Sequence, residues 1–187
     1  TAAINNLRRL GARRGEAREE TYRIEGNLGK LFESRGFKVI QGFHPDSEAY
    51  PEVGEIDLIC ARDGIVLVIE VKSSFRRRSQ REAWLHGKTT LRKAGQQLRR
   101  KVEAISRMLA AESGGAELGL TSPCAVKGII ADTSIEHDHE RFNGFLKVSV
   151  EEILIALRDD RKFLADSIGV LGKNNEVHGD GTLAEKQ

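Results

Sequence analysis

The sequence has few of the residues that mark secreted, membrane or fibrous proteins. Its 187 residues include two cysteines, three prolines and one tryptophan, and aromatic side chains make up 5% of the chain. Cys60 and Cys124 lie in apolar segments, so we expect buried free thiols and no disulfide framework. No apolar run approaches the roughly 20 residues that cross a bilayer, and no secretory signal is visible. The composition predicts a cytoplasmic, globular protein with one main domain.

The two ends of the chain differ from its middle. The chain begins at Thr1 and its one methionine is Met108, so we expect either a trimmed chain or a domain cut from a longer protein. We expect an N-terminal arm or short helix over residues 1–15 and an α/β domain over residues 16–168. Residues 169–187 are dominated by Gly, Asn, Lys and Asp, which predicts a flexible tail.

The positive charge is concentrated in one stretch. The formal net charge is +2, but residues 75–101 hold ten basic side chains and one acid, so this basic block carries +9 and the remainder −7. Such a block is typical of a surface that contacts nucleic-acid phosphates, although a solvated helix face is the alternative. The side chains expected to contact phosphates are Arg76, Arg77, Arg78, Lys88, Arg92 and Lys93.

Two apolar segments joined by Asp63-Gly64 organise the chain. Asp-Gly between apolar runs is a strong signal for a β-hairpin. The second run, residues 65–71, is almost continuously Val, Ile or Leu, which is typical of a strand buried on both faces. Asp57, Glu70 and Lys72 lie within these strands. Glu70 and Lys72 are expected on the same face because side chains alternate along a strand.

These three charged side chains are costly to bury unless they pair or bind a metal ion. Two carboxylates and an ammonium that meet at one point would form a site for a hard cation such as Mg²⁺. Such a site can activate water and stabilise the charge that develops on a phosphate. The alternative is a structural ion pair, with Glu70 and Lys72 as edge charges that prevent aggregation. Asp57 on the preceding strand favours the metal site.

The stretch Gly54-Glu55-Ile56-Asp57, followed after a short turn by Glu70-Val71-Lys72, resembles the PD-(D/E)XK nuclease superfamily. The resemblance extends over residues 25–105, with Ile-Asp-Leu where the superfamily is named for Pro-Asp. It implies a central sheet flanked by helices. It also implies that Asp57 and Glu70 bind Mg²⁺ or Mn²⁺, and that Lys72 orients or activates the attacking water.

The same resemblance implies two further site residues on helices. A helix predicted over residues 16–35 carries Glu25, at the place where the family has an acid that reaches the metal; Glu33 is the second choice. A long helix predicted over residues 88–111 carries Gln97 beside its apolar stripe, where several branches place a glutamine that steadies the metal or the substrate. For each of these residues the alternative is an ordinary solvated side chain.

Other side chains are less diagnostic. Trp84 could stack on a base, although a lone tryptophan is more often a packing residue. We interpret His44 as a loop histidine and not as a catalytic base. His137 and His139 form a His-X-His pair, but no third zinc ligand stands at a suitable spacing, so we interpret them as part of a solvated loop.

The predicted order is helix, three strands, long helix, two strands and helix, which indicates an α/β fold with a central mixed β-sheet flanked by α-helices. We expect a metal-dependent endonuclease that hydrolyses phosphodiester bonds of DNA, with RNA left open. The alternatives are a catalytically inactive nucleic-acid-binding module, or the nuclease domain of a restriction, mobile-element or toxin protein. The resemblance also implies a possible homodimer, in which each subunit would cut one strand. If the protein is a toxin, a protective partner protein is expected.

Overall fold

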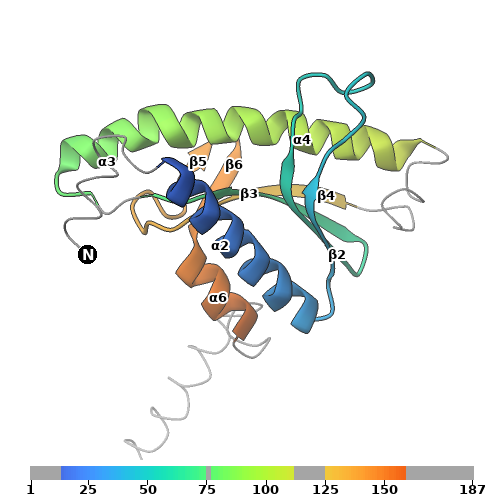
Figure 1. Ribbon diagram of the computed structural model, residues 1–187, viewed down its shortest axis with the longest axis horizontal. Coiled ribbons are helices and arrows are strands. Elements are labelled where there is room, and N and C mark those ends of the chain that lie inside the picture. Colours follow the sequence, from blue (N-terminus) through green and yellow to red (C-terminus); the bar gives the residue numbers. More distant parts are fainter. Residues whose placement is uncertain (1–13, 75–76, 112–124, 159–187) are drawn as a thin grey trace, which may run out of the picture.

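The protein is built on a six-stranded mixed sheet with helices on both faces (Figure 1). The computed structural model describes residues 14–74, 77–111 and 125–158. In chain order the elements are α2 (Arg14–Ser34), β1 (Lys38–Phe43), β2 (Ile56–Arg62), β3 (Ile65–Lys72), α3 (Gln80–His86), the π-helical segment η1 (Gly87–Leu91), α4 (Arg92–Ala110), β4 (Ala125–Asp132), β5 (Arg141–Phe142), β6 (Phe145–Ser149) and α6 (Val150–Arg158).

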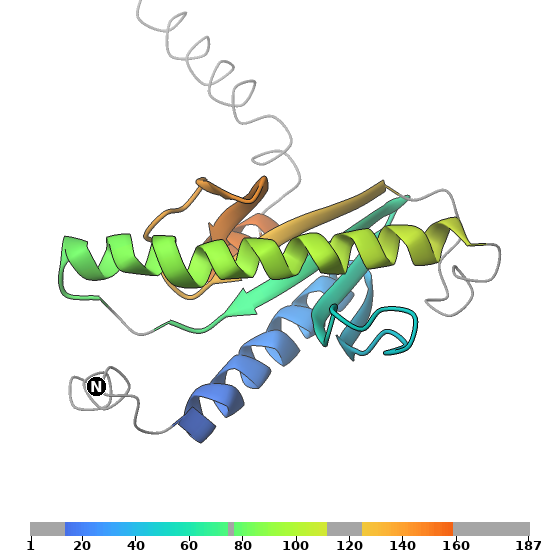
Figure 2. The same cartoon turned by 90° about the horizontal axis from the view of Figure 1, so that it is seen from above.

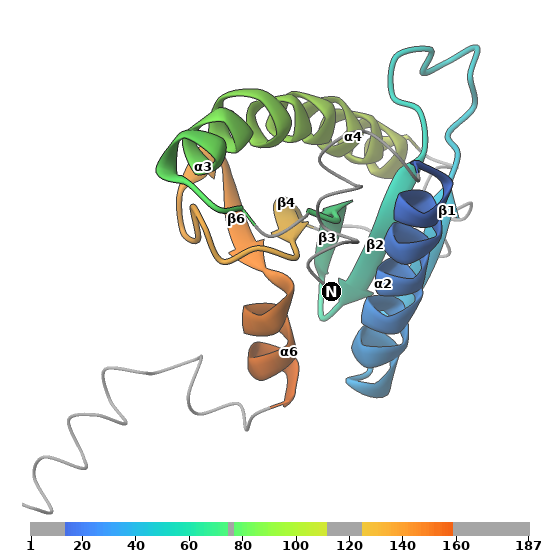
Figure 3. The ribbon, with the colours of Figure 1, turned by 60° about the vertical axis from the view of Figure 1, so that its left-hand side comes forward.

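The sheet has the order β1-β2-β3-β4-β6-β5. The β1–β2, β2–β3 and β5–β6 pairs are antiparallel, whereas β4 lies parallel to β3 and β6 lies parallel to β4. The α4 helix runs across one face (Figure 2), and α2 and α6 lie on the other (Figures 1 and 3). The predicted α/β fold with a mixed sheet between helices is confirmed.

The core consists of two apolar layers separated by the sheet. On one side Leu91, Leu98 and Ile105 pack on Val66 and Val68. The other layer places α2 and α6 against the opposite strand face, through Leu28, Phe32, Leu58, Ile69 and Ile153. Because successive strand residues face opposite layers, the predicted burial of β3 on both faces is confirmed. The same alternation places Glu70 and Lys72 on the α4 side with Val66 and Val68.

Two turns have the conformation that their residue types predict. Asp63 and Gly64 both have positive φ, 50° and 75°, and join the antiparallel strands β2 and β3, as the Asp-Gly signal predicts. The α2 helix ends at Ser34 and is followed by Gly36, where φ is 80°. There the N–H of Gly36 donates to Glu33 and that of Phe37 donates to Phe32. The Phe37 ring packs edge-on against Phe32 at 5.1 Å, so the predicted C-cap is a Schellman motif.

Three predicted boundaries were wrong. The long helix begins at Gln80 and not at residue 88, because Ser79 caps α3 by accepting the N–H of Glu82 at 3.2 Å. The polar sequence over residues 41–53 predicts a loop, but the first strand extends through Phe43. The polar stretch before β6 contains a two-residue strand, β5, paired with β6. In each case an interaction that local composition does not show decided the boundary: the Ser79 cap for α3, pairing with β2 for β1, and pairing with β6 for β5.

Several predictions fall on residues that the structure does not describe. They concern Arg76, Cys124, the tail over residues 169–187 and the arm over residues 1–15, of which only the last two residues belong to α2. Cys60 is a buried free thiol, as predicted. Among the residues described, no helix combines the length and apolar character needed to span a membrane.

Candidate functional site

Two carboxylates from neighbouring strands meet at a single buried ammonium group. The Nζ atom of Lys101, on α4, donates to Oδ1 of Asp57 at 2.9 Å and also to Oε2 of Glu70. The Lys101 and Glu70 side chains are 5% and 2% exposed, and that of Asp57 is 15% exposed. Burial lowers the pKa of Lys101, but attraction and hydrogen bonds to Glu70 and Asp57 outweigh it and leave the pKa raised. Lys101 is therefore a permanent cation at this point.

Further hydrogen bonds fix the two carboxylates in place. Asp57 Oδ2 accepts the backbone N–H of Val71 at 2.7 Å, which ties the start of β2 to the end of β3. Glu70 Oε1 accepts from Nζ of Lys72 at 2.5 Å. The structure therefore brings together Asp57, Glu70 and Lys72, the three residues predicted from the strand pattern.

Glu25 lies in the electrostatic field of this group. It is 8% exposed on α2, and its pKa is raised to about 7 by burial first and then by repulsion from Asp57 and Glu55. Lys101 opposes this rise, and Glu70 adds to it. The second choice, Glu33, is exposed. Its negative charge instead affects Cys60, whose pKa is raised to about 12 by burial and then by repulsion from Glu33. Glu25 is therefore the helix acid associated with the site.

An open cleft adjoins Lys72. Its volume is about 330 Å³, and it is lined by Lys72, Thr89, Thr90, Lys93 and Gln97. Gln97 and Lys72 thus line the same cleft, and the role of Gln97 in steadying the metal or the substrate stays a prediction. Two of the lining residues belong to the π-helical segment η1, and such insertions in helices are frequent at functional sites. The cleft therefore has two ammonium groups, those of Lys72 and Lys93, in its lining.

The donor set fits a hard divalent cation. Asp57, Glu70 and Glu25 offer carboxylate oxygens, the ligands that Mg²⁺ and Mn²⁺ prefer, and Lys101 already holds one positive charge between two of them. Across residues 14–74, 77–111 and 125–158, no three His, Cys, Asp or Glu side chains form a ready-made metal cluster. Two carboxylates with retained waters is the usual arrangement for Mg²⁺, so the residues fit that ion if Lys101 moves aside.

A second buried carboxylate lies on the next strand. Asp132 is fully buried and pairs in register with Lys72. The hydroxyls of Ser74 and Ser134 each donate a hydrogen bond to its carboxylate at 2.7 Å, and His86 Nε2 is hydrogen-bonded to the same carboxylate at 2.8 Å. Burial raises the pKa of Asp132, but these hydrogen bonds outweigh it, so the pKa is lowered. The group ties the segment after β3 to β4 and α3.

The predicted phosphate contacts fall into two classes. Arg77 was predicted to contact phosphate, but its side chain is 4% exposed and donates to Glu136 at 2.8 Å. The guanidinium faces the protein, so this prediction is corrected to a structural ion pair. Arg78, Lys88, Arg92 and Lys93 are exposed. The last three follow one another along η1 and α4 beside the cleft, where phosphate contact remains a prediction.

The histidines and the tryptophan also have defined places. His137 lies 2.8 Å from the Ala83 carbonyl and 2.9 Å from Glu140, and His139 lies 2.6 Å from Glu152. His44 is exposed, 4.0 Å from Glu55. Trp84 is 59% exposed, so the interpretation of Trp84 as a packing residue was wrong.

Sequence reasoning missed Lys101, Asp132 and His86. The α4 stripe at positions 91, 94, 98, 105 and 108 is buried, and position 101 completes its alternating steps of three and four. A lysine in that register must be buried and therefore paired, which was the available signal. Asp132 ends a strand like Lys72 does, but nothing in its local pattern distinguishes it from a loop residue.

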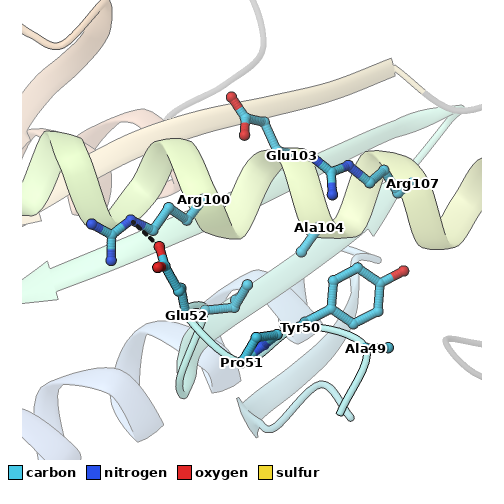
Figure 4. A pocket seen from close by; sticks show the side chains of 9 residues that line it. Ala49, Tyr50, Pro51, Glu52, Arg100, Glu103, Ala104 and Arg107 are labelled. Carbon is cyan, nitrogen blue, oxygen red and sulfur yellow. Dashed lines mark ion pairs between the residues drawn. The ribbon is translucent and has the colours of Figure 1, made fainter. Parts of the chain in front are cut away.

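A separate pocket of about 220 Å³ lies between the loop before β2 and the C-terminal half of α4 (Figure 4). Tyr50 and Val53 of this loop pack against the core, and Arg100 lies 3.7 Å from Glu52. The pocket contains none of the three carboxylates and no part of Lys72. The loop therefore braces α4 rather than lining the cleft beside Lys72.

Comparison with protein families gives a match over most of this architecture. The model of the nuclease-related domain, NERD, matches residues 14–131, from the start of α2 almost to the end of β4. That span is well over half of the chain, and it includes Glu25, Asp57, Glu70, Lys72 and Lys101. Comparison with curated proteins finds no significant match. The chain therefore belongs to the nuclease-related domain family, within the PD-(D/E)XK-like nuclease superfamily.

Proposed function

We propose that this domain is a metal-dependent endonuclease that hydrolyses phosphodiester bonds of DNA. One observation carries the proposal: Asp57 and Glu70 converge on a single cationic position, with Lys72 beside it at the edge of an open cleft. Burying carboxylates costs free energy, so their convergence needs an explanation. In a nuclease-related domain, a metal site for phosphodiester hydrolysis supplies that explanation.

Each side chain has a distinct role in the proposed reaction. Asp57 and Glu70 would hold Mg²⁺ or Mn²⁺, with Glu25 as the supporting carboxylate. A bound divalent cation supplies stabilisation of the charge on the phosphate and a lower pKa for a bound water. Lys72 would orient the attacking water or stabilise the phosphorane-like charge, because its ammonium lies between Glu70 and the cleft. Gln97 would steady the substrate from the opposite wall.

The basic residues that line the cleft would hold the DNA backbone. Lys93 shares the cleft with Lys72, and Lys88 and Arg92 follow on the adjoining helix surface. Contacts of this kind give affinity that depends on salt and not on sequence. The proposed substrate is therefore defined by its backbone and by its shape.

A cleavage assay on the intact chain tests the proposal. Linear duplex, closed circular, single-stranded and branched DNA would be incubated with Mg²⁺, with Mn²⁺ and with a chelator. We expect nicking or cutting that needs the metal and is lost on chelation. Absence of cleavage of all four substrates under both metals would contradict the proposal.

The second candidate is a nucleic-acid-binding module without chemistry. The position of Lys101 favours it, because an ammonium that already neutralises Asp57 and Glu70 could replace the metal permanently. Calorimetric titration with Mn²⁺ separates the two candidates. A specific binding heat that disappears in Asp57→Asn supports the nuclease, whereas no heat with retained DNA binding supports the module.

A further inference from the structure

A second cavity lies beside the cleft and is not used by the proposed chemistry. Its volume is about 570 Å³, within the range of small-molecule sites. It lies between the α3–η1–α4 segment and the hairpin formed by β5 and β6, and its walls include Trp84, Lys88, Arg92, His137, Arg141 and Phe142. The walls therefore combine aromatic rings with three cationic side chains and one carboxylate, Glu140, which lies 2.9 Å from His137.

Trp84 is the most unusual of these residues. It is the only tryptophan in the chain, and its side chain is 59% exposed at the rim of the cavity. The ammonium of Lys88 lies 6.0 Å from the centre of its ring. A large exposed ring beside cations is the combination that binds single-stranded nucleic acid, since bases stack on the ring and phosphates meet the charges.

The opposite wall is held rigidly. His137 lies 2.8 Å from the Ala83 carbonyl, one residue before Trp84, and its ring meets Phe142 edge-on at 5.9 Å. Asn143 donates to the carbonyl of Gly95 at 3.2 Å. A side chain at Gly95 would approach the Phe142 carbonyl to 2.4 Å, so glycine allows the hairpin to contact α4 closely. The cavity is thus a preformed space between two braced elements.

The cavity and the cleft share one helical segment. Lys88 and Arg92 line the cavity, whereas their chain neighbours Thr89 and Lys93 line the cleft at Lys72. A strand laid along this segment would contact both spaces within a few nucleotides. A duplex could present only stacked bases here, whereas an unpaired strand can turn a base toward Trp84.

We propose that this cavity binds an unpaired base of single-stranded DNA, so that the nuclease acts next to a single-stranded segment. The inference rests on the proposed function because it names the substrate of that site. It differs from phosphate contact, since it assigns an aromatic base-stacking position that selects unpaired over paired DNA. Base stacking of this kind changes affinity by about tenfold per base.

Tryptophan fluorescence tests the assignment on the full chain, because Trp84 is the only such fluorophore. The background is Glu70→Gln, so that binding is measured without cleavage. We expect oligo-dT to quench the emission and a blunt duplex of equal length to quench it far less. Trp84→Ala should weaken oligo-dT binding about tenfold by fluorescence anisotropy of labelled DNA, with duplex binding changed less than twofold. Trp84→Phe should restore most of the affinity.

Leu85 provides the matched control, since it is the next residue, is 51% exposed and does not line the cavity. Leu85→Ala should bind oligo-dT as the parent does. Equal binding of oligo-dT by Trp84→Ala and its parent, or no detectable oligo-dT binding, overturns the inference. Tighter binding of oligo-U than oligo-dT overturns the assignment to DNA. Stacking at Trp84 without metal-dependent cleavage by the wild type would uphold this inference and refute the proposed nuclease activity, so the two failures are distinguishable.

Discussion

Two groups of buried carboxylates lie on the same face of the sheet, on neighbouring strands, and they are satisfied in opposite ways. Asp132 has one negative charge and receives three hydrogen bonds from His86, Ser74 and Ser134. These bonds lower its pKa in spite of complete burial. Around Asp57 and Glu70 the compensation comes from ammonium groups, and the nearby Glu25 has its pKa raised to about 7.

The difference separates a structural group from a functional one. The hydrogen-bonding capacity of the buried Asp132 carboxylate is satisfied within the fold, because each of its oxygens is bonded to a serine hydroxyl and one of them also to the His86 imidazole. The other group pairs two carboxylates, Asp57 and Glu70, with two ammoniums, Lys72 and Lys101, and it adjoins an open cleft. Burial, and then repulsion from Asp57 and Glu55, raises the pKa of the nearby Glu25, so a further cation at this group would offset part of that repulsion.

Removing one carboxylate of the metal site should have the largest effect on activity. Asp57→Asn keeps an oxygen that can accept the Val71 N–H but lowers the charge available to Mg²⁺. We expect cleavage to fall by about 10³-fold, the loss of several kcal/mol of metal assistance. The unfolding free energy should change little, because lost pairing with Lys101 is offset by relief of the repulsion with Glu25. Plasmid cleavage and urea unfolding measure the two effects. Activity within tenfold of the wild type would contradict the site.

The opposite result is expected for the Asp132 group. Asp132→Ala leaves His86 and two serines without a buried acceptor, which should lower the free energy of unfolding by about 3 kcal/mol. Urea denaturation measures this change, with Glu48→Ala, an exposed carboxylate, as the control. If Asp132→Ala unfolds at the wild-type midpoint, the group does not hold the sheet to α3 and the contrast fails.

Much of the fold could be predicted because local chemistry determined it. Asp63-Gly64 specified a hairpin, Gly36 specified a helix end, and the apolar run after Gly64 specified a strand with two buried faces. The spacing of Asp57, Glu70 and Lys72 within those strands then placed three groups of the candidate site. In these stretches the backbone requirement and the side-chain pattern indicate the same structure.

The remaining residues could not be predicted, because their roles depend on distant partners. Lys101 was counted with the solvated basic block, but α4 buries it against two strands more than thirty residues earlier in the chain. Arg77 was assigned to phosphate and instead pairs with Glu136. Both residues are charged, and composition alone does not show whether a charge faces water or a partner.

Replacing the internal cation should reveal competition for the metal. Lys101→Met removes the ammonium that neutralises Asp57 and Glu70 while keeping a side chain of similar length. We expect Mg²⁺ or Mn²⁺ to bind about tenfold more tightly, because the ion no longer displaces an ammonium. Added metal should therefore raise the Tm of the variant more than that of the wild type.

Differential scanning fluorimetry with and without metal measures this shift. Lys93→Met is the matched control, because Lys93 lies about two turns earlier on the same helix and is exposed. Equal metal-induced shifts in Lys101→Met and the wild type would show that the ammonium and the metal do not share a position.

The smallest expected effect is a pH dependence caused by Glu25 in the metal-free protein. Burial, followed by repulsion from Asp57 and Glu55, raises its pKa from 4.5 to about 7. Between these values the folded chain holds more protons at Glu25 than the unfolded chain, so the contribution of Glu25 to stability is fully present below pH 4.5 and is lost as the pH rises through 7. Glu25→Gln should remove on the order of 1 kcal/mol of this fall. Urea unfolding at pH 5 and pH 8 in chelator measures it, with exposed Glu33→Gln as the control. A fall of equal size in both variants would show that the pKa of Glu25 is not raised in the folded protein.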